Sequence, residues 1–445
     1  MQILITLSLA LLVGLMLSRV AKLLGLPAVT AYLVAGILIG PFLLGAVEIP
    51  KIGFLGFNSA ESGADVNIDT YSLISDVALG FIAFAIGNEF RISQLKKIGK
   101  QATVIGIVQA VVTTVVVDVF LIVLHFILPD NVLPLPAAIT LGAIASATAP
   151  AATLMVVKQY KAKGPLTDIL LPVVALDDAV GLVLFAISFG VSRALHSGAV
   201  NIAGIILEPI IEVVFSLMLG FVMGLLFTYF ERFFHSNSKR LAMSLCFVLF
   251  TVALSKLEFS LGGIHVAFSP LLACMMLGTV FCNICDFSDE LMSRTDKWSA
   301  PILVLFFVLS GAELNLLVFL DWKIVVIGVV YIIARSAGKY SGAMLSAKSV
   351  KCDDNIVKYL GITLLPQAGV ALGMAIKAEE KLGGDLGSLI ASITLFAVLV
   401  YELFGPMLTK IALTKAGDIK PEEKKSSRLQ DSGEFRRPHE DHPHI

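Results

Sequence analysis

The sequence predicts an all-helical membrane protein whose helices form two inverted six-helix repeats joined by one linking helix. Three observations predict this fold class. Hydrophobic residues make up 57% of the chain and charged residues only 15%, whereas about 25% charged residues is usual in soluble domains. The apolar residues lie in many long runs, and a bilayer core about 30 Å thick needs roughly 20 helical residues to cross it. Two of the runs are interrupted by proline beside small or polar residues.

The apolar runs divide the chain into 13 expected transmembrane helices. The first run lacks a basic segment and a small-residue cleavage site, so we interpret it as a span and not as a signal peptide. The spans form a transmembrane domain over residues 1–412, and the polar composition of residues 413–445 predicts a disordered tail. The expected spans are residues 1–17, 27–46, 71–90, 102–128, 134–157, 166–192, 202–230, 240–256, 262–284, 299–320, 322–346, 356–376 and 386–412.

The distribution of lysine and arginine predicts how these spans are oriented. Basic residues are concentrated in alternate loops, such as 91–100, 158–163 and 348–358, and are sparse in the others. Short loops rich in lysine and arginine stay on the cytoplasmic side. We therefore expect a multi-pass protein of the cell (inner) membrane, embedded in lipid, with the N-terminus outside and the C-terminal tail in the cytoplasm. An odd number of spans agrees with that orientation.

Two spans contain a proline where the middle of the membrane is expected. The fifth span has Pro150 within the small and polar residues 146–153, and the twelfth has Pro366 within residues 364–373. Proline removes a backbone donor, and the freed carbonyl groups are tolerated at that depth where they line a cavity. Because the two spans are seven apart, they occupy corresponding places in two six-helix repeats, which is typical of transporters with a binding site at the midplane. The alternative is a pair of ordinary helix kinks.

Two adjacent carboxylates, Asp177 and Asp178, lie near the middle of the sixth span. An aspartate at the centre of a membrane helix costs about 2.5–3.5 kcal/mol on insertion scales, so a pair without a function is improbable. Neighbouring residues on a helix point about 100° apart. One carboxylate can therefore face a cation while the other faces a basic partner.

The eleventh span supplies two candidates for that basic partner, Arg335 and Lys339. They are four residues apart and share one face of the helix. The alternative is that their long side chains reach the cytoplasmic interface. The two candidates would act differently, because a buried lysine can lose its proton whereas an arginine does not.

The sequence also excludes several classes of function. It contains no P-loop, no dinucleotide fingerprint and no H-E-x-x-H motif, so we expect neither an enzyme nor a bound cofactor, and no nucleic-acid partner. A channel would need a continuous polar stripe, but the charges concentrate at one depth. An intramembrane aspartyl protease needs its two aspartates on different helices. A sodium-coupled solute symporter stays open as an alternative.

These residues together resemble the monovalent cation/proton antiporter superfamily, over about residues 1–412. The Asp-Asp pair is the most specific element, and it is joined by the glycine and proline residues of 25–27 and 40–41, the phenylalanines that precede Gly311, and the sequence 366–369. The G-K-x-x-G sequence of residues 338–342 is similar to that of the electrogenic sodium/proton exchangers, and this resemblance favours Lys339 as the ion-pair partner of Asp177. Arg335 is then expected to contact another core acid or the cytoplasmic interface. Arg335 stands where the electroneutral branch carries its arginine, and Ala149 replaces an aspartate of that branch.

The resemblance implies how such a protein would be built and would work. A core of spans 4–6 and 11–13 would hold the broken helices 5 and 12, which cross at the ion site. The remaining spans would form a dimerisation domain or scaffold, against which the core moves as a rigid body in a homodimer. The expected function is exchange of a monovalent cation, most simply Na⁺, for protons; a K⁺/H⁺ antiporter of the same superfamily is the alternative.

The chemistry of the residues predicts the ligands of this cation. A hard cation takes oxygen ligands. The candidates are Asp178, Asp177 and the hydroxyl group of Thr148, with Ser146 and the freed carbonyl groups of the fifth span beside them. Protons compete for the same carboxylates, so cation and proton would bind in turn. The expected partners are therefore small monovalent cations and protons.

Overall fold

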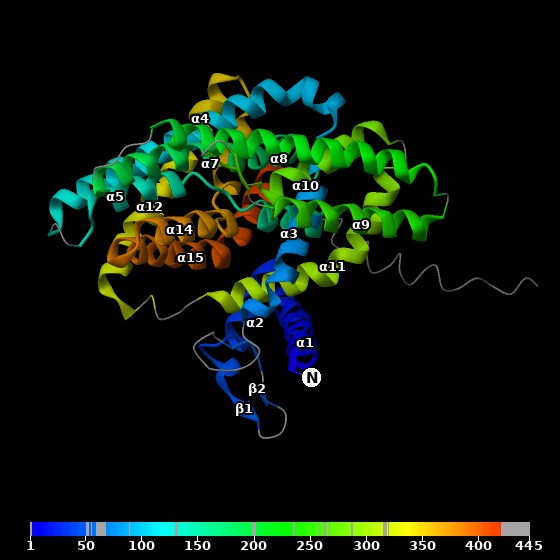
Figure 1. Cartoon of the computed structure of the whole chain (residues 1–445), viewed down its shortest axis with the longest axis horizontal. Coiled ribbons are helices and arrows are strands. Elements are labelled where there is room, and N and C mark those ends of the chain that lie inside the picture. Colours follow the sequence, from blue (N-terminus) through cyan, green and yellow to red (C-terminus); the bar gives the residue numbers. More distant parts are fainter. Residues whose placement is uncertain are drawn as a thin grey trace, which may run out of the picture.

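The computed structural model describes most of the chain as helix (Figure 1). The described residues are 2–49, 53–54, 56–58, 68–88, 90–129, 132–197, 202–234, 236–257, 259–261, 264–266, 268–285, 288–314, 318 and 320–419. The expected disordered tail lies almost wholly outside them. Within them the 15 α-helices are α1 Gln2–Leu23, α2 Ala28–Ile39, α3 Ser72–Asn88, α4 Ile92–Ile127, α5 Leu135–Ile144, α6 Pro150–Tyr160, α7 Pro165–Ser197, α8 Ile202–Glu231, α9 Asn237–Ser255, α10 Pro270–Ile284, α11 Ser288–Glu313, α12 Trp322–Ser349, α13 Asp354–Thr363, α14 Gly369–Leu382 and α15 Gly384–Ala416.

Seven of the described helices are long and apolar enough to cross a membrane, namely α1, α4, α7, α8, α9, α12 and α15. Four more, α2, α3, α5 and α10, are apolar but shorter. Each of the 13 expected spans overlaps one helix, or two helices where the span is interrupted. The all-helical membrane class is therefore confirmed, and the number of membrane crossings stays a prediction.

Both proline-containing spans are divided into two helices. Residues 145–149 separate α5 from α6, and residues 364–368 separate α13 from α14. Pro150 is the first residue of α6, where its missing N–H group leaves no helical hydrogen bond unmade. The backbone N–H of Ala149 donates to the carbonyl oxygen of Pro366 at 2.8 Å. The two breaks, more than 200 residues apart in sequence, therefore lie in contact.

Several expected spans begin at a different residue in the structure, with the largest differences at α4, α10 and α11. The span predicted at 102–128 begins earlier, at Ile92. The span predicted at 262–284 begins only at Pro270, because the described residues before it form the antiparallel hairpin of β3 (Phe259–Leu261) and β4 (Ile264–Val266). The helix predicted at 299–320 begins earlier, at Ser288, and ends at Glu313. A second hairpin pairs β1 (Glu48–Ile49) with β2 (Gly53–Phe54), near the short 3₁₀ helices Leu44–Ala46 and Ile68–Tyr71.

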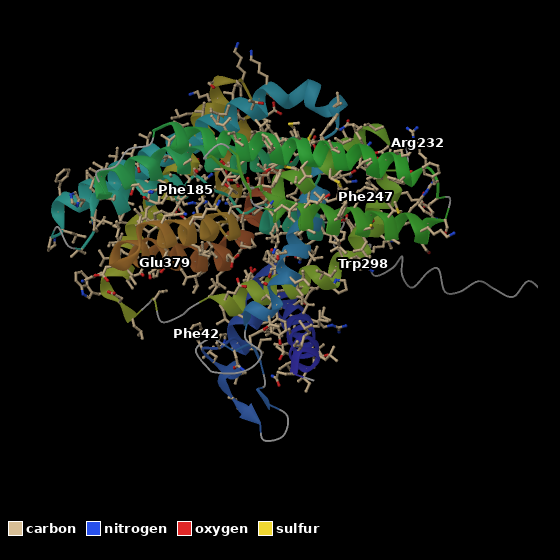
Figure 2. All side chains as sticks on the ribbon, in the orientation of Figure 1. Phe42, Phe185, Arg232, Phe247, Trp298 and Glu379 are labelled. Carbon is tan, nitrogen blue, oxygen red and sulfur yellow. The ribbon has the colours of Figure 1, made fainter. Side chains whose placement is uncertain are left out.

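Most of the buried apolar side chains belong to three clusters, and the two largest are described here. One lies mainly among α2, α3 and α8–α11 and includes Phe227, Phe281 and Phe307. The other lies among α4, α5, α7, α12, α14 and α15 and includes Phe185 and Tyr331. Figure 2 shows Phe185 beside α5 and α7 toward the left, and Phe247 of the first cluster beside α9 on the right. Of the broken helices, α5 and α14 pack in the second cluster, whereas α6 and α13 contribute to a third cluster.

Candidate functional site

The two glycines of the G-K-x-x-G sequence let α12 pack directly against α4. A Cβ atom on Gly338 would lie 2.9 Å from the Cα of Thr113, and one on Gly342 would lie 2.9 Å from the Cα of Gln109. Small residues spaced by four allow the backbones of two membrane helices to approach this closely. The contact places Lys339, which lies between the two glycines, against the middle of α4.

Lys339 forms a fully buried ion pair with Asp177 of α7. Lys339 Nζ lies 2.7 Å from Asp177 Oδ2, and both side chains have 0% exposure. Of the two basic candidates, Lys339 is the one that makes this contact. A buried ion pair requires further hydrogen bonds, because each desolvated charge is otherwise uncompensated. The surrounding residues supply those bonds.

The break between α5 and α6 contributes two of the surrounding oxygen atoms. The Thr148 hydroxyl donates to Asp177 Oδ2 and accepts from Lys339 Nζ at 2.9 Å. The carbonyl oxygen of Ser146 also accepts from Lys339. The hydroxyl of Ser146, however, donates to the Ala143 carbonyl of its own helix end at 2.7 Å. Ser146 therefore reaches the ion pair through its backbone and not through its side chain.

Gln109 of α4 completes the surroundings of the pair, and the sequence analysis did not single it out. Its Nε2 donates to Asp177 Oδ1, and its Oε1 accepts from Lys339 Nζ at 3.0 Å. The side chain is fully buried. A polar residue in the middle of the apolar fourth span was the available signal. Four oxygen atoms, from Asp177, Thr148, Gln109 and Ser146, thus surround the Lys339 ammonium group.

Arg335 lies one turn before Lys339 and contacts neither an acid nor the interface in the described bonds, so the expectation for it was wrong. Its guanidinium group is fully buried and donates to the carbonyl oxygens of Ala145 at 2.9 Å, Ala147 at 2.7 Å and Leu365 at 2.7 Å. It also lies 4.5 Å from the ring centroid of Tyr401. The planar fork of an arginine suits several acceptors held in one plane. Arg335 therefore joins the two breaks.

Both breaks follow the C-terminal end of a short helix, α5 or α13, and such ends carry a partial negative charge and unpaired carbonyl groups. The guanidinium group of Arg335 compensates the partial negative charge at both helix ends and donates hydrogen bonds to carbonyl groups of both breaks. Gln367 adds a second link, because its Nε2 donates to the carbonyl of Ile144 at 3.1 Å and to the Tyr331 hydroxyl at 3.0 Å. These residues hold the two interrupted backbones in register beside the ion pair.

The structure describes the side chains of only some of the predicted cation ligands. Asp177 and Thr148 lie together in the ion-pair cluster. The backbone of Asp178 belongs to α7, but its side chain lies outside the described part of the structure. Asp177, Thr148, the Ser146 carbonyl and the Gln109 carbonyl are hard oxygen donors at one point, which is the chemistry that a small cation requires. In this structure the ammonium group of Lys339 is the positive charge that these four oxygen atoms surround.

Comparisons with known proteins match the whole membrane region. The sequence model described as "Sodium/hydrogen exchanger, transmembrane" matches residues 7–413. The chain is 25% identical over 420 residues to the Na(+)/H(+) antiporter NhaS4 of Synechocystis, covering 92% of this chain and 96% of the relative. It is 23% identical over 291 residues to the Na(+)/H(+) antiporter NhaG of Bacillus atrophaeus, covering 64% and 54% of the two chains.

A solved structure shares the fold. The sodium proton antiporter MjNhaP1 of Methanocaldococcus jannaschii, determined at pH 8, superimposes with a TM-score of 0.66 at 19% sequence identity. The superposition covers 94% of this chain and 99% of the other. The overall fold of this chain therefore occurs in a protein of known structure.

Proposed function

The chain belongs to the sodium/hydrogen exchanger family, and we propose from this premise that Asp177 and Asp178 bind sodium and protons in turn at the two helix breaks. The protein is a multi-pass membrane antiporter that exchanges Na⁺ for H⁺, and it is not an enzyme. Family membership sets aside the symporter, channel and protease alternatives.

The observation that carries the proposed mechanism is the buried pair of Lys339 and Asp177 at the contact of the two breaks. A charge this deeply buried is stable only with its partner. A cation that binds Asp177 must therefore displace the ammonium group, and the displaced lysine can release its proton, which an arginine at this place could not do. Competition for one carboxylate then couples the movement of the cation to that of the proton.

The cation ligands in this proposal are Asp178, Asp177 and the Thr148 hydroxyl, with the carbonyl of Ser146 beside them. Lys339 leaves as the cation arrives, so one positive charge replaces another among the same oxygen atoms. The net charge of the site changes little. A site without either positive charge would hold unpaired carboxylates in a low-dielectric interior, which is strongly unfavourable. Only a loaded site therefore crosses the membrane.

The proposed architecture assigns a moving part to the residues around the site. The core consists of α4–α7 and α12–α15, which includes both pairs of broken helices, and the scaffold consists of α1–α3 and α8–α11. We propose 13 membrane crossings in two inverted repeats with crossed fifth and twelfth spans, an outside N-terminus and a cytoplasmic C-terminus. The core moves against the scaffold like an elevator, and the scaffold forms a homodimer.

Transport by the purified protein in proteoliposomes tests the function. A pH-sensitive dye inside the vesicles should report proton movement when Na⁺ is added outside, and the response should be absent from protein-free vesicles. Li⁺, K⁺ and Rb⁺ added in place of Na⁺ would identify the preferred cation and test the K⁺/H⁺ alternative. A sodium response measured with and without a voltage clamp by potassium and valinomycin reveals the stoichiometry. Sealed vesicles that contain folded protein and show no cation-dependent proton movement would contradict the proposal.

A further inference from the structure

We propose that Glu402 of α15 is a further proton-binding residue of the antiporter, neutral in the arrangement seen here and ionised when the core moves away from Glu313. The inference rests on the proposed function, because it assumes that α15 moves with the core past the scaffold helix α11. It concerns an acid that forms no hydrogen bond or ion pair with the described cation ligands.

Glu402 lies within a long apolar helix, at the depth of the helix breaks. The residue before it, Tyr401, has its ring centroid 4.5 Å from the guanidinium carbon of Arg335. Three residues after it, a Cβ on Gly405 would lie 3.0 Å from Pro366. An ionisable residue inside a membrane helix suggests a function, because a charge at that depth is unfavourable. Glu402 therefore places an acid at the level of the ion site, on a helix that does not carry the aspartate pair.

The next residue places this part of α15 at the boundary between the proposed core and the proposed scaffold. The carbonyl oxygen of Leu403 accepts a hydrogen bond from Thr30 Oγ1 of α2 at 3.4 Å. The side chain of Leu403 packs against both of the two largest apolar clusters. The surroundings of Glu402 must therefore change when the core moves along the scaffold.

The carboxyl group of Glu402 is buried without a partner. The residue is only 5% exposed, and it makes no hydrogen bond or ion pair with the residues that the structure describes. An ionised carboxylate in such a place is strongly unfavourable unless a positive charge or several hydrogen bonds compensate it. A carboxylic acid that keeps its proton avoids this penalty. The surroundings therefore favour the neutral form of Glu402.

The charged group that acts on Glu402 is a second acid, Glu313, which is the last residue of the scaffold helix α11. Two like charges oppose each other's ionisation. Because the two acids belong to parts that move relative to each other, separation of α15 from α11 would remove this repulsion. The proton on Glu402 and the position of the core are thereby linked.

The ion pairs and hydrogen bonds described for the helices that contact α15 do not reach Glu402. Helices α2 and α5 carry no charged residue, and Asp354 and Lys358 of α13 are exposed. The side chain of Asp178 on α7 lies outside the described part of the structure. The basic groups that have other partners are Arg335 with three carbonyl groups, Lys339 with Asp177, Lys158 with Asp296, Lys377 with Glu212, and Lys410 of α15 itself with the Gly25 carbonyl. The tyrosine hydroxyls with other partners are those of Tyr160, which donates to Leu26, and Tyr331, which accepts from Gln367.

The proposed step is a protonation equilibrium. In the arrangement seen here the Glu402 carboxyl group holds one proton. When the core moves, the O–H bond breaks, the proton passes to water and the carboxylate remains, while no other bond changes. Acidic conditions therefore favour the present arrangement, and alkaline conditions favour its departure. This step adds to the competition between cation and proton at the aspartate pair.

Infrared difference spectroscopy of the purified protein tests whether Glu402 holds a proton. The C=O stretch of a protonated carboxyl group is separate from the bands of a carboxylate, and it shifts in D₂O. Spectra at neutral pH without Na⁺ should show a loss of intensity in this band for Glu402→Gln relative to the wild type. Glu379→Gln is the matched control and should show no loss, because Glu379 is an acid of the core helix α14 that accepts from Ser388 at 3.1 Å in an exposed position.

The pH profile of exchange in proteoliposomes at saturating Na⁺ tests the link to movement. Glu402→Gln imitates the protonated form at every pH, so its maximal rate at alkaline pH should fall below that of the wild type. Glu313→Gln removes the like charge, so the acidic limb of the profile should shift by about one unit toward lower pH. In the Glu402→Gln background the same substitution should cause no shift, because the group on which Glu313 acts is absent.

A Glu402→Gln spectrum identical to that of the wild type would overturn the inference. So would a shift caused by Glu313→Gln that persists in the Glu402→Gln background. If Glu402→Gln does not fold, the infrared titration of Glu313→Gln decides, since the carboxylic-acid band must then disappear at lower pH than in the wild type, and an unchanged titration rejects the role. A wild type that shows the band but no cation/proton exchange is a failure of the proposed function and not of this inference.

Discussion

At the scale of single residues, the surroundings of Asp177 are the ones that the structure describes. Asp177 is enclosed by Lys339, Gln109 and Thr148, so both of its carboxylate oxygens are already bound. Asp178 is the next residue along α7. In the proposed mechanism a cation binds Asp178 first. It reaches Asp177 only after the ammonium group of Lys339 has left.

Asp178→Asn should abolish exchange, because it removes an anionic ligand that both the cation and the proton need. We expect sodium-dependent proton movement in proteoliposomes to fall to the level of protein-free vesicles, with the melting temperature of the purified protein unchanged. Asp168, an exposed acid near the start of the same helix, supplies the matched control Asp168→Asn, which should retain exchange. A folded Asp178→Asn variant that exchanges at the wild-type rate would remove Asp178 from the ligand set.

At the scale of helices, the two breaks depend on a side chain that belongs to neither. The carbonyl groups at the ends of α5 and α13 have no partner within their own helices, and an unpaired buried carbonyl costs about 1–3 kcal/mol. Arg335 of α12 satisfies Ala145, Ala147 and Leu365 together. The arginine therefore stabilises the interrupted backbones, whereas Lys339 on the same helix belongs to the ion pair.

Arg335→Gln should lower the free energy of unfolding by about 2–4 kcal/mol, since at least two carbonyl groups lose their donor. The measurement is the melting temperature of the purified protein in detergent. Lys348→Gln, which removes an exposed cation near the end of the same helix, should leave it unchanged. Equal melting temperatures for Arg335→Gln and the wild type would show that the breaks do not need the arginine.

At the scale of the whole molecule, several polar contacts join the proposed core to the proposed scaffold on the side where α6 ends. Lys158 of α6 pairs with Asp296 of α11 at 2.6 Å. The backbone N–H of Ala28 donates to Gln159 Oε1 at 2.9 Å, and the Tyr160 hydroxyl donates to the Leu26 carbonyl at 3.3 Å. These bonds must break if the core moves along the scaffold. They therefore favour the arrangement seen here.

Exchanging the charges of Lys158 and Asp296 tests whether this ion pair affects the movement of the core. Lys158→Asp should change the apparent KM for Na⁺ by up to about fivefold, because a partly exposed pair contributes about 0.2–1 kcal/mol. The combined variant with Lys158→Asp and Asp296→Lys should return the KM toward the wild-type value. Exchange rates at graded sodium concentrations provide the measurement. A combined variant that is no closer to the wild type than Lys158→Asp alone would exclude a role for this pair in the movement.

The all-helical membrane class, both helix breaks and the charged residues of the site could be predicted without a structure. Composition and run length determine whether a helix can cross a bilayer, and proline interrupts a helix wherever it falls inside one. An aspartate pair or a lysine in an apolar run is conspicuous for the same reason, since burial of a charge is unfavourable unless it has a function. These properties are local, and they can be read from a few consecutive residues.

The partners of those charges depended on how distant helices pack. Arg335 and Lys339 share one face of α12, and a difference of one turn decides that Arg335 meets the carbonyl groups of the breaks while Lys339 meets Asp177. Gln109 contacts Lys339 because Gly338 and Gly342 allow α12 to pack closely against α4. Hydrogen bonds act over about 3 Å, whereas the positions they join here are up to 230 residues apart in the chain. Contacts of that kind follow from the packing of the helices, which local sequence patterns do not specify.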